Sequence, residues 1–123
     1  MSKRVLDVGN CGLDHSSITR LMQREFNAET VAAHDADEAL RQAKSGKYAL
    51  VLVNRVLDGD GSSGLDIVQA LKSDPATKDL PVMMITNYSA HEAKAVAVGA
   101  EPGFGKSTLN EPDTIERLGK FLK

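Results

Sequence analysis

The sequence has one cysteine, Cys11, no tryptophan, and aromatic residues at only 4% of its 123 positions. A single cysteine excludes an internal disulfide bond and fits a reducing compartment, so we expect the protein to be cytoplasmic. Few aromatics, a net charge of −2 and no basic stripe argue against binding to nucleic acid. No apolar run approaches the ~20 residues of a membrane span, and the N-terminus lacks a secretory signal. We therefore expect partners other than nucleic acid or membrane.

Short apolar segments alternate with helical patterns along the whole chain, without repeats or linkers. A chain of this length, 41% hydrophobic and 26% charged, is typical of one globular domain, which we place at residues 1–123. The apolar runs predict strands at 4–8, 29–33, 49–53, 82–85 and 103–105. Helical periodicity and breakers predict helices at 14–27, 35–45, 64–73, from 89 to a stop at Gly99, and from 111 onward. Two capping boxes, Asp35 with Glu38 and Ser89 with Glu92, support two of the helix starts.

Five βα units in succession favour an α/β, doubly wound parallel sheet with helices on both faces, a three-layer arrangement. In such sheets the functional crevice lies outside the carboxyl ends of the strands. Polar or small residues follow four of the predicted strands: Gly9 and Asn10, Asn54, Thr86, and Lys106. We expect these residues to meet at one edge of the sheet.

Several segments together resemble the receiver domain of two-component response regulators, of the stand-alone chemotaxis type. They are Arg4–Val8 with its following loop, Tyr48–Asn54, Gly64–Val68, Leu80–Thr86, and Gly99–Lys106. The resemblance implies a flavodoxin-like (βα)5 fold with strand order 2-1-3-4-5. It also implies phosphoryl transfer from a histidine kinase to an aspartate that ends the third strand. In that family, two acidic residues after the first strand help to hold Mg²⁺, and a Thr or Ser and a Lys contact the phosphoryl group.

Carried over residue by residue, the resemblance is incomplete at its chemical centre. Thr86 and Lys106 match the phosphoryl-contact positions, but Asn54 falls on the phosphoacceptor and Gly9 and Asn10 on the acidic pair. An amide lacks the nucleophilic oxygen of a carboxylate, so Asn54 cannot form an acyl phosphate. Mg²⁺ prefers anionic oxygens, so we expect its binding to be weak or absent and assign no metal or cofactor.

The switch positions of the family also differ. Gly103 falls on the position of the switch aromatic, Phe104 comes one place later with its side chain expected to face the other way, and Ser107 replaces the family's proline. We therefore predict a pseudo-receiver that is not an enzyme. It would act by phosphorylation-independent contact with a histidine kinase or another signalling protein. The sequence also allows a homodimer.

The family's usual partner face combines the fourth helix, fifth strand and fifth helix. Here that prediction selects His91, Lys94, Ala95, Glu101, Phe104 and Phe121. The alternative is a small-anion or ligand sensor, or a residual enzyme, that reuses the crevice with Asp7, Cys11, Asn54, Thr86 and Lys106.

Two residues near the crevice and two short motifs have competing interpretations. Asp7 interrupts an apolar strand, so it is either satisfied by local polar groups or points into the crevice. Cys11 has no Cys or His neighbour in sequence and is best interpreted as inert. The string 103–108 echoes a phosphate-binding loop, but the required upstream glycine is Ala100. The segment 58–64 fails the calcium-loop spacing and predicts an extended loop over the crevice.

Overall fold

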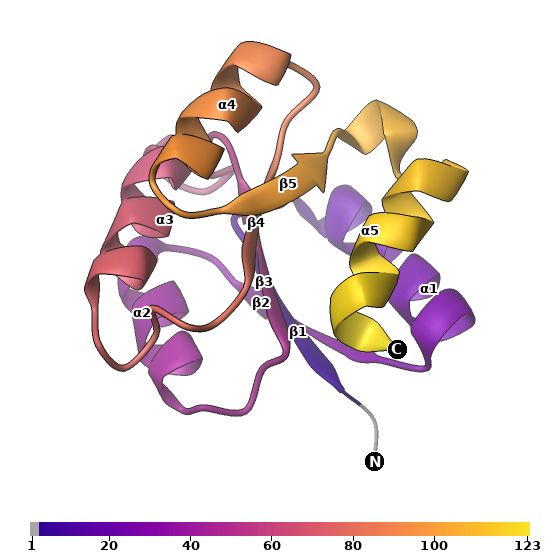
Figure 1. Ribbon diagram of the computed structural model, residues 1–123, viewed down its shortest axis with the longest axis horizontal. Coiled ribbons are helices and arrows are strands. Elements are labelled where there is room, and N and C mark those ends of the chain that lie inside the picture. The colour runs from indigo at the N-terminus through magenta and orange to yellow at the C-terminus, as the bar shows by residue number, and fades with distance from the viewer. Residues whose placement is uncertain (1–2) are drawn as a thin grey trace.

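In the computed structural model, which describes residues 3–123, five parallel strands form one sheet in the order β2-β1-β3-β4-β5 (Figure 1). The strands are β1 (Arg4–Val8), β2 (Glu29–Ala33), β3 (Leu50–Asn54), β4 (Val82–Ile85) and β5 (Glu101–Phe104). The helices are α1 (Gly12–Phe26), α2 (Ala36–Lys44), α3 (Gly64–Ser73), α4 (Ser89–Ala97), the 3-10 turn η1 (Lys106–Thr108) and α5 (Pro112–Leu122). The expected flavodoxin-like strand order is confirmed.

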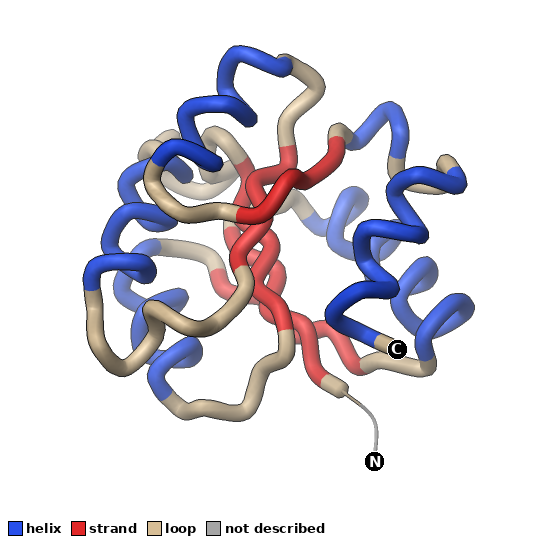
Figure 2. The backbone as a smooth tube through the Cα atoms, viewed as in Figure 1, coloured by secondary structure: helices blue, strands red, loops and turns tan. Residues whose placement is uncertain are grey.

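The sheet lies between two layers of helices, with α2, α3 and α4 on one face and α1 and α5 on the other (Figure 2). Alternate residues along a strand pack against the two helical layers. In β3, Val51 and Val53 pack under α2 and α3, whereas Leu50 and Leu52 pack under α1 and α5. Because both faces are covered, all five residues of β3 are buried, which explains the apolar run over residues 50–53.

The helix starts agree only partly with the sequence signals. Asp35 caps α2 as predicted, since its Oδ1 accepts from the Glu38 backbone N–H at 2.8 Å. The Glu38 carboxylate, however, accepts from the backbone of His34 and so does not close the predicted box. The second box is wrong: Tyr88 holds the N-cap position of α4 and no side chain caps the helix there. Since α4 also buries only Ala95 fully, it is lightly anchored to the sheet.

Two element starts differ from the predicted ones by two residues. Helix α1 begins at Gly12, two residues before the predicted start, and β5 begins at Glu101 rather than Gly103. Across residues 3–123, no helix combines the length and the apolar character needed to cross a lipid bilayer.

Candidate functional site

The loops at the carboxyl ends of the strands enclose an open crevice of about 510 Å³. Three of the residues selected from sequence line it, namely Asn54 from β3, Thr86 after β4 and Lys106 after β5. Cys11 and Asp14, at the start of α1, line it too. The expectation that one edge of the sheet gathers these side chains therefore holds for Asn54, Thr86 and Lys106, whereas Gly9 and Asn10, which were predicted with them, do not line the crevice.

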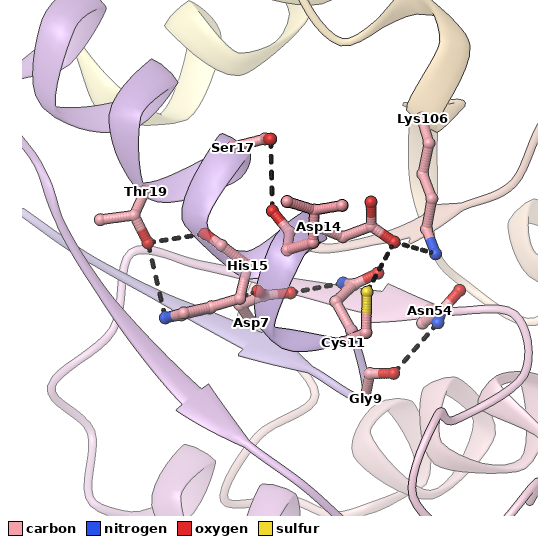
Figure 3. Close-up of polar contacts among 11 residues, drawn as sticks. Asp7, Gly9, Cys11, Asp14, His15, Ser17, Thr19, Asn54 and Lys106 are labelled. Atoms are coloured by element: carbon pink, nitrogen blue, oxygen red, sulfur yellow. Dashed lines mark hydrogen bonds and ion pairs between the residues drawn. The ribbon is translucent and has the colours of Figure 1, made fainter.

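Asn54 ties two strands together through its amide N–H. The residue is 9% exposed, and its Nδ2 donates to the backbone oxygen of Gly9 at 3.0 Å (Figure 3). The backbone N–H of Asp58 donates to the same oxygen at 2.9 Å. A carboxylate has no proton to donate to a carbonyl oxygen, so an aspartate could not make the bond that Asn54 makes.

Gly9 is fixed by its backbone and by a neighbour. Its φ of +77° lies in the left-handed region, and a β-carbon at this position would overlap Leu57 Cγ and approach Leu57 Cα to 3.1 Å. Leu57 is 1% exposed. The space that an acidic side chain would need at position 9 is therefore filled by a leucine from the β3–α3 loop.

The β3–α3 loop, which was predicted as a long loop over the crevice, does line the crevice and places Leu57 by turning back on itself. Leu57 N–H donates to Ser62 O at 3.0 Å, and Gly61 N–H donates to Leu57 O at 2.9 Å. Val56 and Ser63 form an antiparallel bridge at the neck of the turn. These bonds direct Leu57 inward, while Asp58 stays on the exposed side.

Both carboxylate oxygens of Asp7 have hydrogen-bond partners nearby in the sequence, and Asp7 does not line the crevice. It is 1% exposed; its Oδ1 accepts from Asn10 Nδ2 at 2.5 Å, and its Oδ2 lies 2.6 Å from His15 Nδ1 (Figure 3). Burial raises the pKa of the Asp7 carboxyl group, and the hydrogen bonds from His15 and Asn10 oppose that rise. Both oxygens are occupied, so the alternative in which Asp7 replaces the missing acidic pair is not supported. The sequence analysis missed His15, although it lies in the first turn of the helix that follows Asp7.

Lys106 has a carboxylate partner that the sequence did not predict. Its Nζ lies 2.8 Å from Asp14 Oδ2, and the Cys11 thiol donates to the same oxygen at 3.3 Å (Figure 3). The hydrogen bond from Lys106 is the main reason that the pKa of Asp14 is lowered. The counter-charge of Lys106 therefore comes from the first turn of α1 rather than from a strand end.

The two loops beside Thr86 are joined by an asparagine. Thr86 Oγ1 accepts from the backbone N–H of Tyr88 at 3.2 Å. Asn87 Oδ1 accepts from both the backbone N–H of Ser107, at 3.2 Å, and its hydroxyl, at 2.9 Å. Ser107, in the position of the family's proline, thus links the β4–α4 loop to η1.

The position of the switch aromatic is closed by backbone packing. A β-carbon on Gly103 would overlap the carbonyl oxygen of Met84, and Arg117 donates to the carbonyl oxygen of Gly103. Phe104 is 3% exposed and packs in the core beside α1 and α5. No aromatic side chain fits at position 103 with this backbone.

Two residues of the predicted partner face are not on the surface. Phe104 is buried as described, and Ala95 is 1% exposed because it packs against the sheet. Their inclusion was wrong, because neither side chain is available to a partner. His91, Lys94, Glu101 and Phe121 all retain exposed or partly exposed side chains.

The residues present do not fit the magnesium ion that the family uses. Within residues 3–123, no group of three or more His, Cys, Asp or Glu side chains is arranged to hold a metal. Leu57 fills the space beside Gly9, and Asn54 directs an N–H toward the Gly9 carbonyl oxygen. Asn10 Oδ1 is buried without a partner, but one neutral oxygen does not replace the anionic ligands that Mg²⁺ prefers.

Comparison with known proteins supports the fold and the family. The sequence profile of the response regulator receiver domain matches residues 14–111. No curated protein matches the chain significantly.

Three solved structures illustrate the similarity. The signal receiver domain of a DNA-binding response regulator from Colwellia psychrerythraea 34H has a TM-score of 0.81 at 23% identity, covering 97% of both chains. The chemotaxis response regulator CheY4 of Vibrio cholerae has a TM-score of 0.71 at 22% identity, covering 98% of this chain and 95% of its own. A response regulator from Burkholderia pseudomallei, crystallised with a phosphorylated aspartic acid, a calcium ion and citrate, has a TM-score of 0.73 at 23% identity, covering 99% of this chain and 67% of its own. At these identities the likeness establishes the fold alone.

Proposed function

The chain belongs to the family of response regulator receiver domains, and on that premise we propose that it signals in the cytoplasm through phosphorylation-independent contact with a protein partner. The observation that carries this proposal is the bond from Asn54 Nδ2 to the Gly9 carbonyl oxygen. It makes the residue at the acceptor position a hydrogen-bond donor that joins the end of β3 to the loop after β1. In this role the domain is a pseudo-receiver and not an enzyme.

The loss of phosphoryl transfer follows from the chemistry of the site. An amide nitrogen does not form an acyl phosphate, and the space beside Gly9 is occupied by Leu57. The two carboxylates that line the crevice are Asp14 and Asp58, and Asp14 is already paired with Lys106. Neither lies at the end of β3, where the family's acceptor stands.

Helix α4 offers a surface suited to a protein partner. Its outward side exposes small apolar residues, Ala90, Ala93, Val96 and Ala97, beside the charged Lys94. Small side chains permit close approach of a partner backbone, and Val96 is 40% exposed. We assign the partner contact to α4 and its neighbours through His91, Lys94, Glu101 and Phe121, with a histidine kinase or another signalling protein as the partner.

The first experiment tests phosphorylation directly. The protein is incubated with acetyl phosphate and Mg²⁺, and its intact mass is measured beside that of the phosphorylatable receiver from Burkholderia pseudomallei. We expect the control to gain a phosphoryl group and this chain to keep its mass. Gain of one phosphoryl group by this chain, mapped to any aspartate, would refute the proposal.

The second experiment tests the assigned surface. A partner captured by the wild-type protein should be lost with Lys94→Glu and retained with Arg41→Glu, a charge reversal on the exposed side of α2. Equal capture by both variants would exclude the α4 surface as the binding face.

A further inference from the structure

Arg55 is a crevice residue whose charge is left without a partner. It directly follows Asn54, lines the crevice and is partly buried. Among residues 3–123, its guanidinium has no carboxylate within ion-pair distance and makes no side-chain hydrogen bond, in contrast to Lys106, which is paired with Asp14. Of the other five arginines, only Arg41 also lacks both kinds of partner, and Arg41 is exposed on α2. Arg55 therefore presents a planar set of five N–H donors to the crevice with no internal acceptor.

The wall near Arg55 is apolar and exposed. The large hydrophobic side chains exposed in residues 3–123 are Leu13 at 78%, Tyr88 at 63%, Val56 at 41% and Val96 at 40%. Two of these, Val56 and Tyr88, line the crevice itself, and Leu13 precedes the crevice residue Asp14. Single exposed hydrophobic residues are ordinary, but here two of them border a concave site whose other lining residues are mostly polar, so a ligand with an anionic and an apolar part would match both.

The floor of the crevice adds neutral polar groups. Thr86 Oγ1 already accepts from the Tyr88 backbone, so its own hydroxyl proton remains available to an incoming acceptor. The crevice, at about 510 Å³, is larger than an inorganic ion requires and lies within the range of small-molecule sites, roughly 300–1,000 Å³.

We propose that the crevice binds a small organic anion, a carboxylate or a phosphate monoester, that carries an aromatic or comparably flat apolar group. The guanidinium of Arg55 holds the anionic group through paired N–H bonds, and Tyr88 with Val56 contacts the apolar part. The site shares Thr86 with the phosphoryl-contact positions but differs from them in that Arg55 and Tyr88 determine the affinity. It goes beyond the proposed function, which neither requires it nor depends on it.

Four probes separate the contributions of charge and ring. The ¹⁵N-labelled protein is titrated at constant ionic strength with benzoate, acetate, phenyl phosphate and inorganic phosphate, and amide shifts are followed by NMR. We expect saturable shifts at Arg55, Thr86 and Tyr88 with both aromatic anions. The plain anions should bind roughly tenfold more weakly, because they bury no ring against Tyr88. The stronger of the two aromatic probes identifies carboxylate or phosphate as the preferred group.

Matched variants decide the outcome. Arg55→Gln should lower the affinity for the aromatic anions at least roughly tenfold. Arg55→Lys should lower it less, since lysine keeps the charge but loses the paired donors. Arg41→Gln should leave the affinities unchanged. Tyr88→Ala should lower the affinity for benzoate to that for acetate. Equal affinities for Arg55→Gln and Arg41→Gln, or shifts that do not saturate with any probe, would overturn the assignment. The intact-mass assay with acetyl phosphate reads out the proposed function separately, so failure of one is distinguishable from failure of the other.

Discussion

Gly9→Ala is the substitution that most directly probes the altered acceptor site, because it adds one carbon where Leu57 packs. Gly9 has a φ of +77°, and the added β-carbon would overlap Leu57 Cγ and lie 3.1 Å from Leu57 Cα. Leu57 is 1% exposed, so it has little room to move aside. The substitution therefore combines a backbone penalty with overpacking of a buried contact.

The two costs can be estimated separately. A non-glycine residue in the left-handed region costs about 1–2 kcal/mol. Forcing an extra carbon into a packed site costs about 1–3 kcal/mol. Their sum, about 2–5 kcal/mol, is a large part of the roughly 5–15 kcal/mol that stabilises a typical domain. At roughly 4 °C per kcal/mol for a chain of this size, the melting temperature should fall by about 8–20 °C.

Urea titration and thermal melting, each followed by circular dichroism, measure this loss. The matched control is Gly46→Ala, since Gly46 has a φ of +75° but an added β-carbon there meets nothing within 4 Å. It should cost only the backbone penalty, about 1–2 kcal/mol. A Gly9→Ala/Leu57→Ala double variant should cost about 1–3 kcal/mol less than the sum of the single variants, because the overlap is removed. If Gly9→Ala costs no more than Gly46→Ala, the packing argument is refuted.

Two further predictions concern neighbouring polar groups. Asn54→Asp should lower the free energy of unfolding by about 1–3 kcal/mol in urea titrations near neutral pH, since it replaces the donor to the Gly9 carbonyl with an oxygen; stability equal to wild type would contradict the role of that bond. Because burial raises the pKa of Asp7 above its ordinary value of 3.8, stability from this group is present below that value and is lost as pH rises through the raised pKa. Wild type should therefore lose stability relative to Asp7→Asn as pH rises above about 4, as measured by urea midpoints at successive pH values, and a flat difference would count against the raised pKa.

The elements of the fold are predictable from sequence because each depends on local periodicity and on chain breakers. Helix α3 was predicted at its observed bounds, Gly64–Ser73, and β2 at Glu29–Ala33. The burial of β3 could be predicted because a strand that is covered on both faces has an apolar sequence without alternation. The doubly wound parallel sheet followed from alternation and from the handedness of crossovers, whereas the strand order was implied by the resemblance to receiver domains.

The details of the site depend on contacts between distant residues, which periodicity does not report. Lys106 and Asp14 are far apart in sequence. They meet because α1 begins at Gly12, which places Asp14 in its first turn, beside the residue that follows the β5 strand and Gly105. Leu57 reaches Gly9 only because the β3–α3 loop closes with its own hydrogen bonds. The capping box at Ser89 failed for a related reason, since the loop before α4 is held by Thr86 and leaves no side chain in a capping position.

The packing of Leu57 against Gly9 also constrains the routes by which such a domain can change during evolution. An acidic residue at position 9 is blocked while Leu57 occupies that space, and an aspartate at position 54 would remove a bond to the same glycine. Each single substitution therefore gives a less stable protein, so an acidic pocket would require remodelling of the loop first. The residues that replace the family's acidic side chains in this chain are thus also residues that stabilise its fold.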